Sequence, residues 1–300
     1  MQTTHHPIVG ALLFVGGLFL FACMDTTVKY LTAYYPVPMI AALRYIIHCL
    51  LMLMLFAPMH GRQLVHTTRT GWVMIRGASL AAVTLLAGFA FQRMPLAETT
   101  AILFVSPLMV VLVAGPILHE RVGRFEWIAA LVGFLGILLI ARPGGDMDPY
   151  GVGFALCAAL VMTAYQLLSR VLASTERTLA MLFYTALIGS VIFGIALPWY
   201  WEGPVPPLQH SLLFVFVGAT GGLGHFLFTA AYQQAKASTL APLTYVQLLW
   251  AGLLGWLVFG HVPDGLSIAG MSLVAACGVV VGLRSHLASR NAAAVVDMEP

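Results

Sequence analysis

Apolar residues run along this chain in long stretches, and short turns rich in proline, glycine and charged residues separate them. A helix needs about 20 mostly apolar residues to cross the hydrocarbon core of a bilayer. Ten stretches come close to that length, so the pattern predicts an all-α integral membrane protein with ten transmembrane helices. The predicted spans are 8–31, 37–58, 71–92, 97–118, 125–142, 150–173, 178–200, 211–233, 239–259 and 266–284.

The ends of the chain differ from these spans. The first span has no positive segment before it and carries Asp25 and Lys29, so we expect a membrane helix and not a cleavable signal peptide. The chain after Ser285 is short and polar, and we expect a disordered tail over 287–300. The third and fourth spans are divided only by Arg93-Met94-Pro95, which makes their boundary the least sharp.

Lysine and arginine predict the orientation, because cytoplasmic loops of membrane proteins carry an excess of these residues. With the N-terminus inside, the inner loops and helix ends receive Arg62, Arg69, Arg76, Arg121, Arg124, Arg170, Arg177, Lys236, Arg284 and Arg290. The outer side receives Arg93 and Arg142, together with Lys29 and Arg44 inside their spans. We therefore expect both termini to be cytoplasmic, in a bacterial-type inner membrane.

Composition supports a membrane location and excludes several functions. Charged residues make up 8% of the chain and apolar residues 60%, against roughly 25% charged residues in soluble proteins. A net charge of +3 without a basic run gives no footprint for nucleic acid. All four cysteines lie inside apolar spans, which argues against a disulfide framework or a metal site. The chain lacks the motifs HExxH, GxSxG and a phosphate-binding glycine loop, so we expect neither an enzyme nor a cofactor.

A weak internal repeat appears when the chain is shifted by 141 residues against itself. The shift aligns Gly10 with Gly151, Gly77-Ala78 with Gly218-Ala219, and Ala90-Phe91-Gln92 with Ala231-Tyr232-Gln233. Each half holds five spans, and an odd number places the second half upside down relative to the first. The sequence thus predicts two inverted five-helix repeats, 1–145 and 146–286, around a central cavity, which is the architecture of secondary transporters.

The spans also resemble a known family, the ten-helix members of the drug/metabolite transporter superfamily with two EamA-type domains. The resemblance covers nearly the whole chain and is carried by Lys29, Ala41-Ala42-Leu43-Arg44, Ser106-Pro107, His119-Glu120-Arg121 and Gly133-Phe134-Leu135-Gly136. Phe21-Ala22 departs from the usual Trp-Gly pair, and His261 stands where the second half would repeat Glu120. The resemblance implies export of metabolites, and most closely that of the aromatic and other amino acid exporters.

Four charged residues fall in the outer halves of their spans: Asp25, Lys29, Arg44 and Glu98. Charges at this depth are costly unless they are paired or face water, so they are candidate functional groups. Asp25 and Lys29 lie four residues apart on one helix face, in the favourable order for an ion pair. They predict either an outer gate that contacts the substrate carboxylate or a static pair between helices.

A stripe of polar and aromatic residues at helical spacing predicts the binding cavity. His225, Tyr232 and Gln233 share the eighth span, and Gln92 occupies the equivalent place in the third. Tyr245, Gln247 and Trp250 in the ninth span and Tyr165 in the sixth could supply the remaining walls. A cavity with aromatic walls and a few donors suits an amphipathic ligand.

The sequence as a whole predicts a secondary transporter that exports amino acids and related amphipathic metabolites by alternating access. A multidrug or other-metabolite carrier of the same fold is the first alternative, and a membrane-embedded enzyme or scaffold is the second. The expected partners are an amino acid-like substrate and the lipid bilayer, with a monomer or weak dimer as the assembly. Asp25, Glu98 and His225 are the span residues that could exchange protons, and proton coupling is left open.

Overall fold

The computed structural model describes residues 7–118, 124–141, 147–172, 175–201, 203–235 and 240–296, and every regular element within them is helical. The long helices are α1 (Pro7–Leu31), α2 (Val37–His60), α3 (Thr70–Arg93), α4 (Leu96–Leu103), α5 (Ser106–Leu118), α6 (Arg124–Ala141), α7 (Pro149–Leu172), α8 (Thr178–Tyr200), α9 (Leu208–Gln234), α11 (Val246–Phe259) and α12 (Gly265–Val296). Two 3-10 turns, η1 (Gly61–Leu64) and η2 (Ala241–Tyr245), join them.

Proline sets the least certain of the predicted boundaries. Met94 is extended, with φ −128° and ψ 156°, because the residue before a proline is excluded from the helical region, and α3 therefore ends at Arg93. The fourth span was predicted to be one helix, but the structure divides it into two, α4 and α5. Pro107 has no N–H to donate to the carbonyl of Leu103, so the helix is interrupted at Phe104 and Val105.

The last helix is longer than predicted. α12 continues to Val296, so the prediction of a disordered tail was wrong up to that residue. Alanine has the highest helix propensity of the amino acids, so the run Ala292-Ala293-Ala294 favours this continuation.

Helix length and composition support a multi-pass membrane protein. Among the described residues, six helices are long and apolar enough to cross a bilayer: Ile8–Leu31, Val37–Met59, Thr70–Arg93, Pro149–Leu172, Thr178–Tyr200 and Leu208–Phe228. Four shorter apolar segments occupy the other predicted spans: Leu96–Val110, Trp127–Ala141, Leu243–Phe259 and Gly265–Val281. Large apolar side chains such as Leu131 and Leu249 are exposed, which a lipid environment tolerates.

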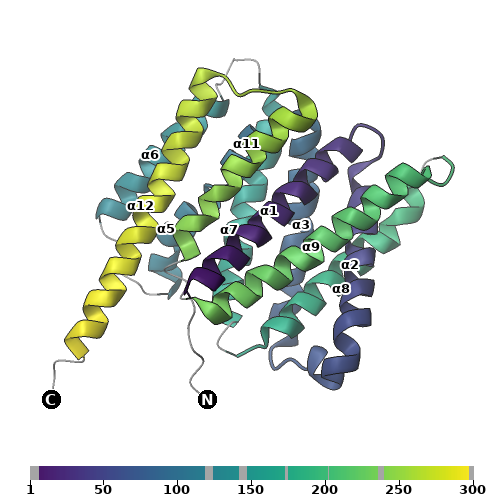
Figure 1. Ribbon diagram of the computed structural model, residues 1–300, viewed down its shortest axis with the longest axis horizontal. Coiled ribbons are helices and arrows are strands. Elements are labelled where there is room, and N and C mark those ends of the chain that lie inside the picture. Colours follow the sequence, from purple (N-terminus) through teal and green to yellow (C-terminus); the bar gives the residue numbers. More distant parts are fainter. Residues whose placement is uncertain are drawn as a thin grey trace.

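The helices pack in pairs that follow the internal repeat, so each pair has an equivalent pair when the two halves of the chain are interchanged. α1 packs along α9 as α3 packs along α7, and α2–α8 and α6–α12 each join equivalent helices of the two halves. Figure 1 shows the α6–α12 pair at one side of the bundle and α2–α8 at the other. Both ends of the chain lie at the same end of the bundle, which we call the terminal end; the other is the distal end.

The inverted repeat extends to single contacts. A Cβ added to Gly10 would lie 2.6 Å from the Cβ of Ala235, and one added to Gly151 would lie 2.6 Å from the Cγ of Met94. Both glycines and both neighbours are 141 residues apart. Each glycine thus permits the same close helix crossing in its own half, and the predicted fold of two inverted five-helix repeats is confirmed.

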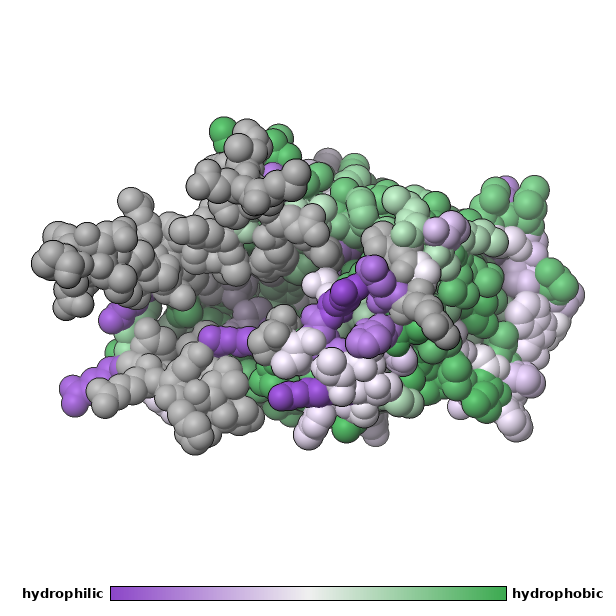
Figure 2. Space-filling model, turned by 90° about the horizontal axis from the view of Figure 1, so that it is seen from below, coloured by the Kyte–Doolittle hydropathy of each residue, from purple (hydrophilic) through white to green (hydrophobic). Residues whose placement is uncertain are grey.

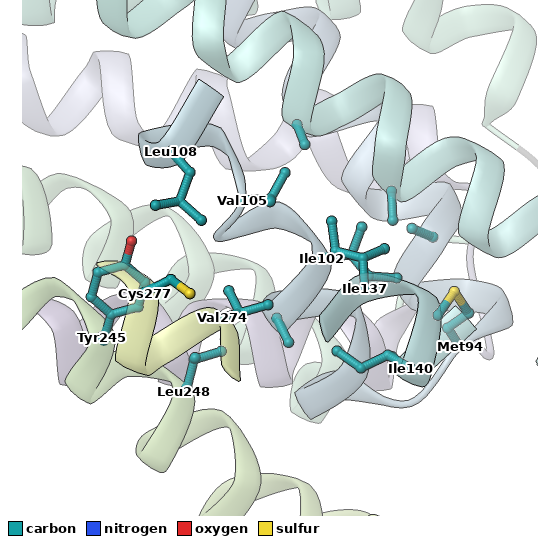
Figure 3. Packing of buried hydrophobic residues seen from close by; sticks show 14 of the residues in the cluster. Met94, Ile102, Val105, Leu108, Ile137, Ile140, Tyr245, Leu248, Val274 and Cys277 are labelled. Atoms are coloured by element: carbon teal, nitrogen blue, oxygen red, sulfur yellow. The ribbon is translucent and has the colours of Figure 1, made fainter. Parts of the chain in front are cut away.

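The largest apolar core lies on the α6–α12 side. Figure 3 shows Ile102, Val105 and Leu108 from the α4–α5 region gathered with Ile137 of α6 and Val274 of α12. α6 and α12 approach so closely that a Cβ on Gly136 would lie 2.7 Å from the carbonyl oxygen of Gly270.

Candidate substrate site within the bundle

Arg44 of α2 has unused hydrogen-bonding capacity inside the bundle. Its Nη1 donates to the hydroxyl of Thr84 on α3 at a long 3.4 Å. Its Nε is buried and has no hydrogen-bond partner among the described residues. A guanidinium has five N–H donors, and a buried polar group normally finds a partner. Arg44 can therefore receive an anionic or carbonyl group of a ligand.

Asp25 of α1 lies near this guanidinium and can supply an acceptor. Its Oδ2 accepts a hydrogen bond of 3.3 Å from the side-chain amide of Gln247 on α11, and its charge interacts with that of Arg44. The equivalent pair in the other orientation is Gln166 and Ser106, joined at 3.2 Å. The repeat therefore places one polar contact between α1 and α11 and an equivalent one between α7 and α5. Only the contact of Asp25 includes a charged residue type.

Lys29 and Asp25 do not form the ion pair that their spacing suggests. The Nζ of Lys29 donates to the backbone carbonyls of Phe91 at 2.8 Å and Met94 at 2.6 Å. These carbonyls belong to the last turn of α3, where the helix leaves its acceptors unsatisfied. Lys29 thus holds the end of α3 against α1, because a nearby helix end offers it better geometry than a residue on its own helix.

Glu98 at the start of α4 is almost completely buried, with 1% of its surface exposed. Its Oε1 lies 2.9 Å from Nε2 of His261, whose side chain is 39% exposed, while its Oε2 has no partner among the described residues. The pair connects a buried carboxylate with the distal surface. Glu98 was predicted to belong to a charged group with Asp25, Lys29 and Arg44, and the structure gives it His261 as its hydrogen-bond partner.

Arg76 of α3 is a polar centre that the sequence analysis missed. Only 5% exposed, it donates to Ser169 at 2.6 Å, Tyr165 at 2.7 Å and Thr185 at 2.9 Å. We had assigned Arg76 to the inner ends of the spans as an orientation marker. The one available signal was that its three partners stand on α7 and α8 at polar positions within apolar spans.

Tyr165 was predicted to line the binding cavity, and it contacts this arginine. Besides accepting a hydrogen bond, its ring lies 4.5 Å from the guanidinium carbon of Arg76. All these partners tie α3 to α7 and α8. The contrast with Arg44 is clear, because Arg76 is bound by the protein itself.

His225 of α9 lies among aromatic rings near the middle of the bundle. Its ring stacks on that of His48 with centroids 5.9 Å apart and an angle of 10°, and the ring of Phe21 meets it edge-on at 4.9 Å. His48 is 4% exposed, and its Nε2 has no partner among the described residues. One turn separates His48 from Arg44 on α2, so this histidine pair adjoins the arginine.

The other predicted site residues lie apart from this cluster. Gln92 is at the surface and donates to the Thr32 carbonyl at 3.3 Å. Tyr245 is buried in the apolar core against Cys277 and Gly278, and Trp250 meets Phe19 edge-on at 5.0 Å. The side chains of two predicted residues lie outside the described part of the chain: Tyr232 and Gln233.

The structure therefore brings Asp25, Arg44, His225 and Gln247 into one region, which we call the central cluster, with His48 as a member that the sequence analysis left out. Within the described residues, no group of three or more His, Cys, Asp or Glu side chains could hold a metal ion. The cluster offers a cation with spare donors, an acid and aromatic rings, which together can bind a small ligand with two unlike ends.

The family model of the EamA-like transporter family matches the chain twice, over residues 8–142 and 149–283. The chain belongs to the EamA-like transporter family. The two EamA segments are separated by the same 141 residues as the internal repeat. The predictions of a transporter and not an enzyme are confirmed, and this EamA-like protein is a secondary transporter of small metabolites.

Three bacterial transporters with named substrates are similar to this chain. The riboflavin transporter of Vibrio cholerae is 29% identical over 91% of this chain and 93% of its own length. The pseudopaline exporter CntI of Pseudomonas aeruginosa is 29% identical over 89% and 94%, and the S-adenosylmethionine uptake transporter of Rickettsia bellii is 26% identical over 75% and 76%.

A solved structure supports the EamA fold. It is a protein crystal structure that superimposes on 92% of this chain and 98% of its own, with a TM-score of 0.66 and 19% identity. At this identity the likeness concerns the fold alone.

Proposed function

We propose that this EamA-like transporter exports small amphipathic metabolites that carry a carboxylate and an ammonium group, namely amino acids and their derivatives. The observation that carries the proposal is the buried Nε of Arg44, which has no partner among the described residues and lies close to the charge of Asp25. A carboxylate would occupy the spare donors of Arg44, and an ammonium group would lie against Asp25.

The energetics favour such a ligand. Arg–carboxylate hydrogen bonds are charge-assisted and stronger than neutral ones. A buried N–H without an acceptor is costly, so a ligand carboxylate that accepts from the Nε of Arg44 is stabilised there, and its ammonium group can lie against the carboxylate of Asp25. Phe21 and His225 form an aromatic edge beside the pair, which suits an apolar side chain of the substrate.

The relatives offer partial support. S-adenosylmethionine, named for the Rickettsia bellii relative, is chemically an amino acid joined to a flat aromatic base. Riboflavin, named for the Vibrio cholerae relative, has no such zwitterion and would use mainly the aromatic walls. A carrier of other metabolites with the same fold is therefore the second candidate. The relatives include one named exporter and one named uptake transporter, so direction is part of the proposal.

The orientation is proposed on the charge bias of the loops. The terminal end carries exposed Arg69, Arg170 and Arg177, and this excess of cations supports a cytoplasmic position for that end in a bacterial inner membrane. Proton coupling would involve Asp25 or Glu98, the acids that lie within the described helical spans near other charges.

Counterflow in proteoliposomes tests the substrate class. Vesicles are loaded in turn with each of the twenty amino acids, riboflavin and S-adenosylmethionine, and entry of the labelled compound is measured. We expect an amphipathic amino acid to exchange, and Arg44→Gln to weaken its apparent affinity by about ten- to a hundredfold. Arg93→Gln, which removes an exposed cation, is the matched control and should leave the affinity unchanged.

Two results would contradict the proposal. Exchange of riboflavin alone would favour the second candidate, and an unchanged affinity in Arg44→Gln would remove Arg44 from the site. Asp25→Asn should weaken binding of the zwitterion but not of an analogue that lacks the amino group. This difference would test the contact between Asp25 and the ammonium group independently of Arg44.

A further inference from the structure

A pocket of about 490 Å³ opens between α2, α8 and α9 in the half of the bundle nearest the terminal end. Its walls are mostly apolar and include Met52, Phe56, Leu179, Leu182 and Phe226. The volume lies within the range of about 300–1,000 Å³ that is typical of small-molecule sites. None of these residues belongs to the central cluster, so the pocket needs an explanation of its own.

The rim of the pocket carries a cation. Arg177 is exposed, and its Nη1 donates to the neutral side-chain amide of Gln63 at 2.7 Å. The neighbouring acid, Glu176, accepts hydrogen bonds from Thr68 and Arg69. Figure 2 shows this end of the molecule, where hydrophilic residues gather beside a strongly hydrophobic flank. Glu176 also lines the pocket, but its carboxylate is held by Thr68 and Arg69, so Arg177 is the charged group at the mouth that can receive an anionic end of a ligand while the apolar walls accept the rest.

The wall of the pocket farthest from its rim adjoins a buried imidazole. It reaches Gly222 of α9, where an added Cβ would lie 3.2 Å from Cδ2 and 3.6 Å from Nε2 of His48. This is the buried nitrogen that has no partner among the described residues. His48 stacks on His225, so the pocket ends beside a residue of the central cluster.

The inverted repeat provides an internal comparison. The equivalent seam at the distal end lies between α2, α3 and α8, and it is filled by an apolar cluster that includes Ala41, Ala81 and Phe193. Tyr45 stacks on Phe193 there, with ring centroids 5.7 Å apart. The positions equivalent to Tyr45 and Phe193 at the terminal end are Ala186 and Met52. The small Ala186 at the position equivalent to Tyr45 leaves more room at the terminal end than the described residues leave in the distal seam.

We propose that this pocket is a loading port through which an amphipathic metabolite passes from the terminal end to His48 and the central cluster. The inference rests on the proposed function, because it requires a carried ligand with a polar and an apolar end. A phospholipid acyl chain would place its apolar end innermost, yet a buried imidazole nitrogen without a partner among the described residues lies beside Gly222 at that wall. The chemistry of the pocket therefore fits a carried metabolite better than a lipid tail.

Blocking the pocket in the folded protein tests the port. In the full chain with its four native cysteines replaced by serine, Ala230→Cys at the pocket wall is reacted with a methanethiosulfonate that adds only a methylthio group, or with a bulky maleimide. We expect the bulky group to abolish counterflow and the small group to preserve it. Ile128→Cys, a lipid-exposed position of α6, is the control that both reagents should leave active.

Full counterflow after complete bulky modification, checked by mass spectrometry, would overturn the port. If that modification instead displaces co-purified phospholipid while transport continues, the pocket is a lipid site and the proposal is wrong. The probes are phenylalanine, riboflavin and S-adenosylmethionine, so a failure of the zwitterion hypothesis leaves the blocking test interpretable with whichever compound is carried.

A second measurement needs no substrate. Ala81→Cys in the distal seam should react far more slowly than Ala230→Cys, and the additional change Tyr45→Ala should raise its rate. Equal reactivity of the two thiols in the parent background would contradict a port that opens at one end only.

Discussion

The hydroxyl of Tyr35 lies 2.7 Å from Nδ1 of His210 at the distal end of the bundle. The repeat-related residues, Glu176 and Arg69, meet at the terminal end, where the carboxylate accepts the backbone N–H of Arg69 at 2.7 Å. In each half, the loop after the first helix is thus fastened to the start of the third helix of the other half. The two fastenings occupy equivalent places but differ in chemistry, because only that of Glu176 depends on a charge.

This difference predicts acid sensitivity at the terminal end. Burial raises the pKa of Glu176. The hydrogen bonds from Thr68 and Arg69 together lower it by more, so the pKa of the folded protein lies below its ordinary 4.5. A lowered folded-state pKa means that the stabilisation is present above the unfolded pKa and is lost as pH falls through the folded pKa. We expect Glu176→Gln to reduce stability by about 1–3 kcal/mol at pH 7, and less as the pH falls below 4.5.

Thermal unfolding of the detergent-solubilised protein between pH 7 and the most acidic tolerated pH measures this difference. Tyr35→Phe is the control at the distal end, since it removes a hydrogen bond without removing a carboxylate. A gap between wild type and Glu176→Gln that stays constant with pH would contradict the assignment.

Arg76 and Arg44 should separate stability from transport. Arg76→Gln leaves Ser169, Tyr165 and Thr185 without their shared donor, and we expect a stability loss of at least about 2 kcal/mol. Arg44→Gln loses one long hydrogen bond and should unfold close to the wild-type temperature while its transport fails. Thermal unfolding and counterflow on the same preparations check both, and the reverse pattern would exchange the roles assigned to these residues.

Glycine substitutions should report the contact between α6 and α12. Gly136→Ala places a Cβ 2.7 Å from the backbone carbonyl of Gly270, which no side-chain rotation can relieve, so the helices must separate. Gly153→Ala in α7 meets nothing within 4 Å and should stabilise its helix by about 0.5–1 kcal/mol. Opposite shifts of the unfolding temperature are expected, and a stabilised Gly136→Ala would show that the helices are not so close.

The proposed orientation predicts one-sided labelling. After removal of the native cysteines, Gly203→Cys between α8 and α9 should react with an impermeant thiol reagent from outside intact cells. Thr175→Cys, between α7 and α8, should react only after the membrane is opened. The loop at Asp146, which lies outside the described residues, should behave as Gly203 does. Reaction of Gly203→Cys from the inside alone would reverse the orientation.

The sequence by itself determined the ten spans, the inverted repeat and the absence of catalytic motifs. These features are readable because the length of an apolar stretch and the spacing of glycines are local properties that the bilayer constrains directly. The shift of 141 residues also identified the glycines that permit close helix crossing, such as Gly10 and Gly151.

Only the tertiary structure decided which partner each buried polar group has. Lys29 was expected to pair with Asp25, four residues away, yet its partners are carbonyls more than 60 residues along the chain. Arg76 was expected at an inner helix end, yet two other helices, α7 and α8, supply its acceptors. A buried charge is satisfied by whichever polar group the packing brings within about 3 Å, and helix packing depends on the whole set of side chains, which no local pattern contains.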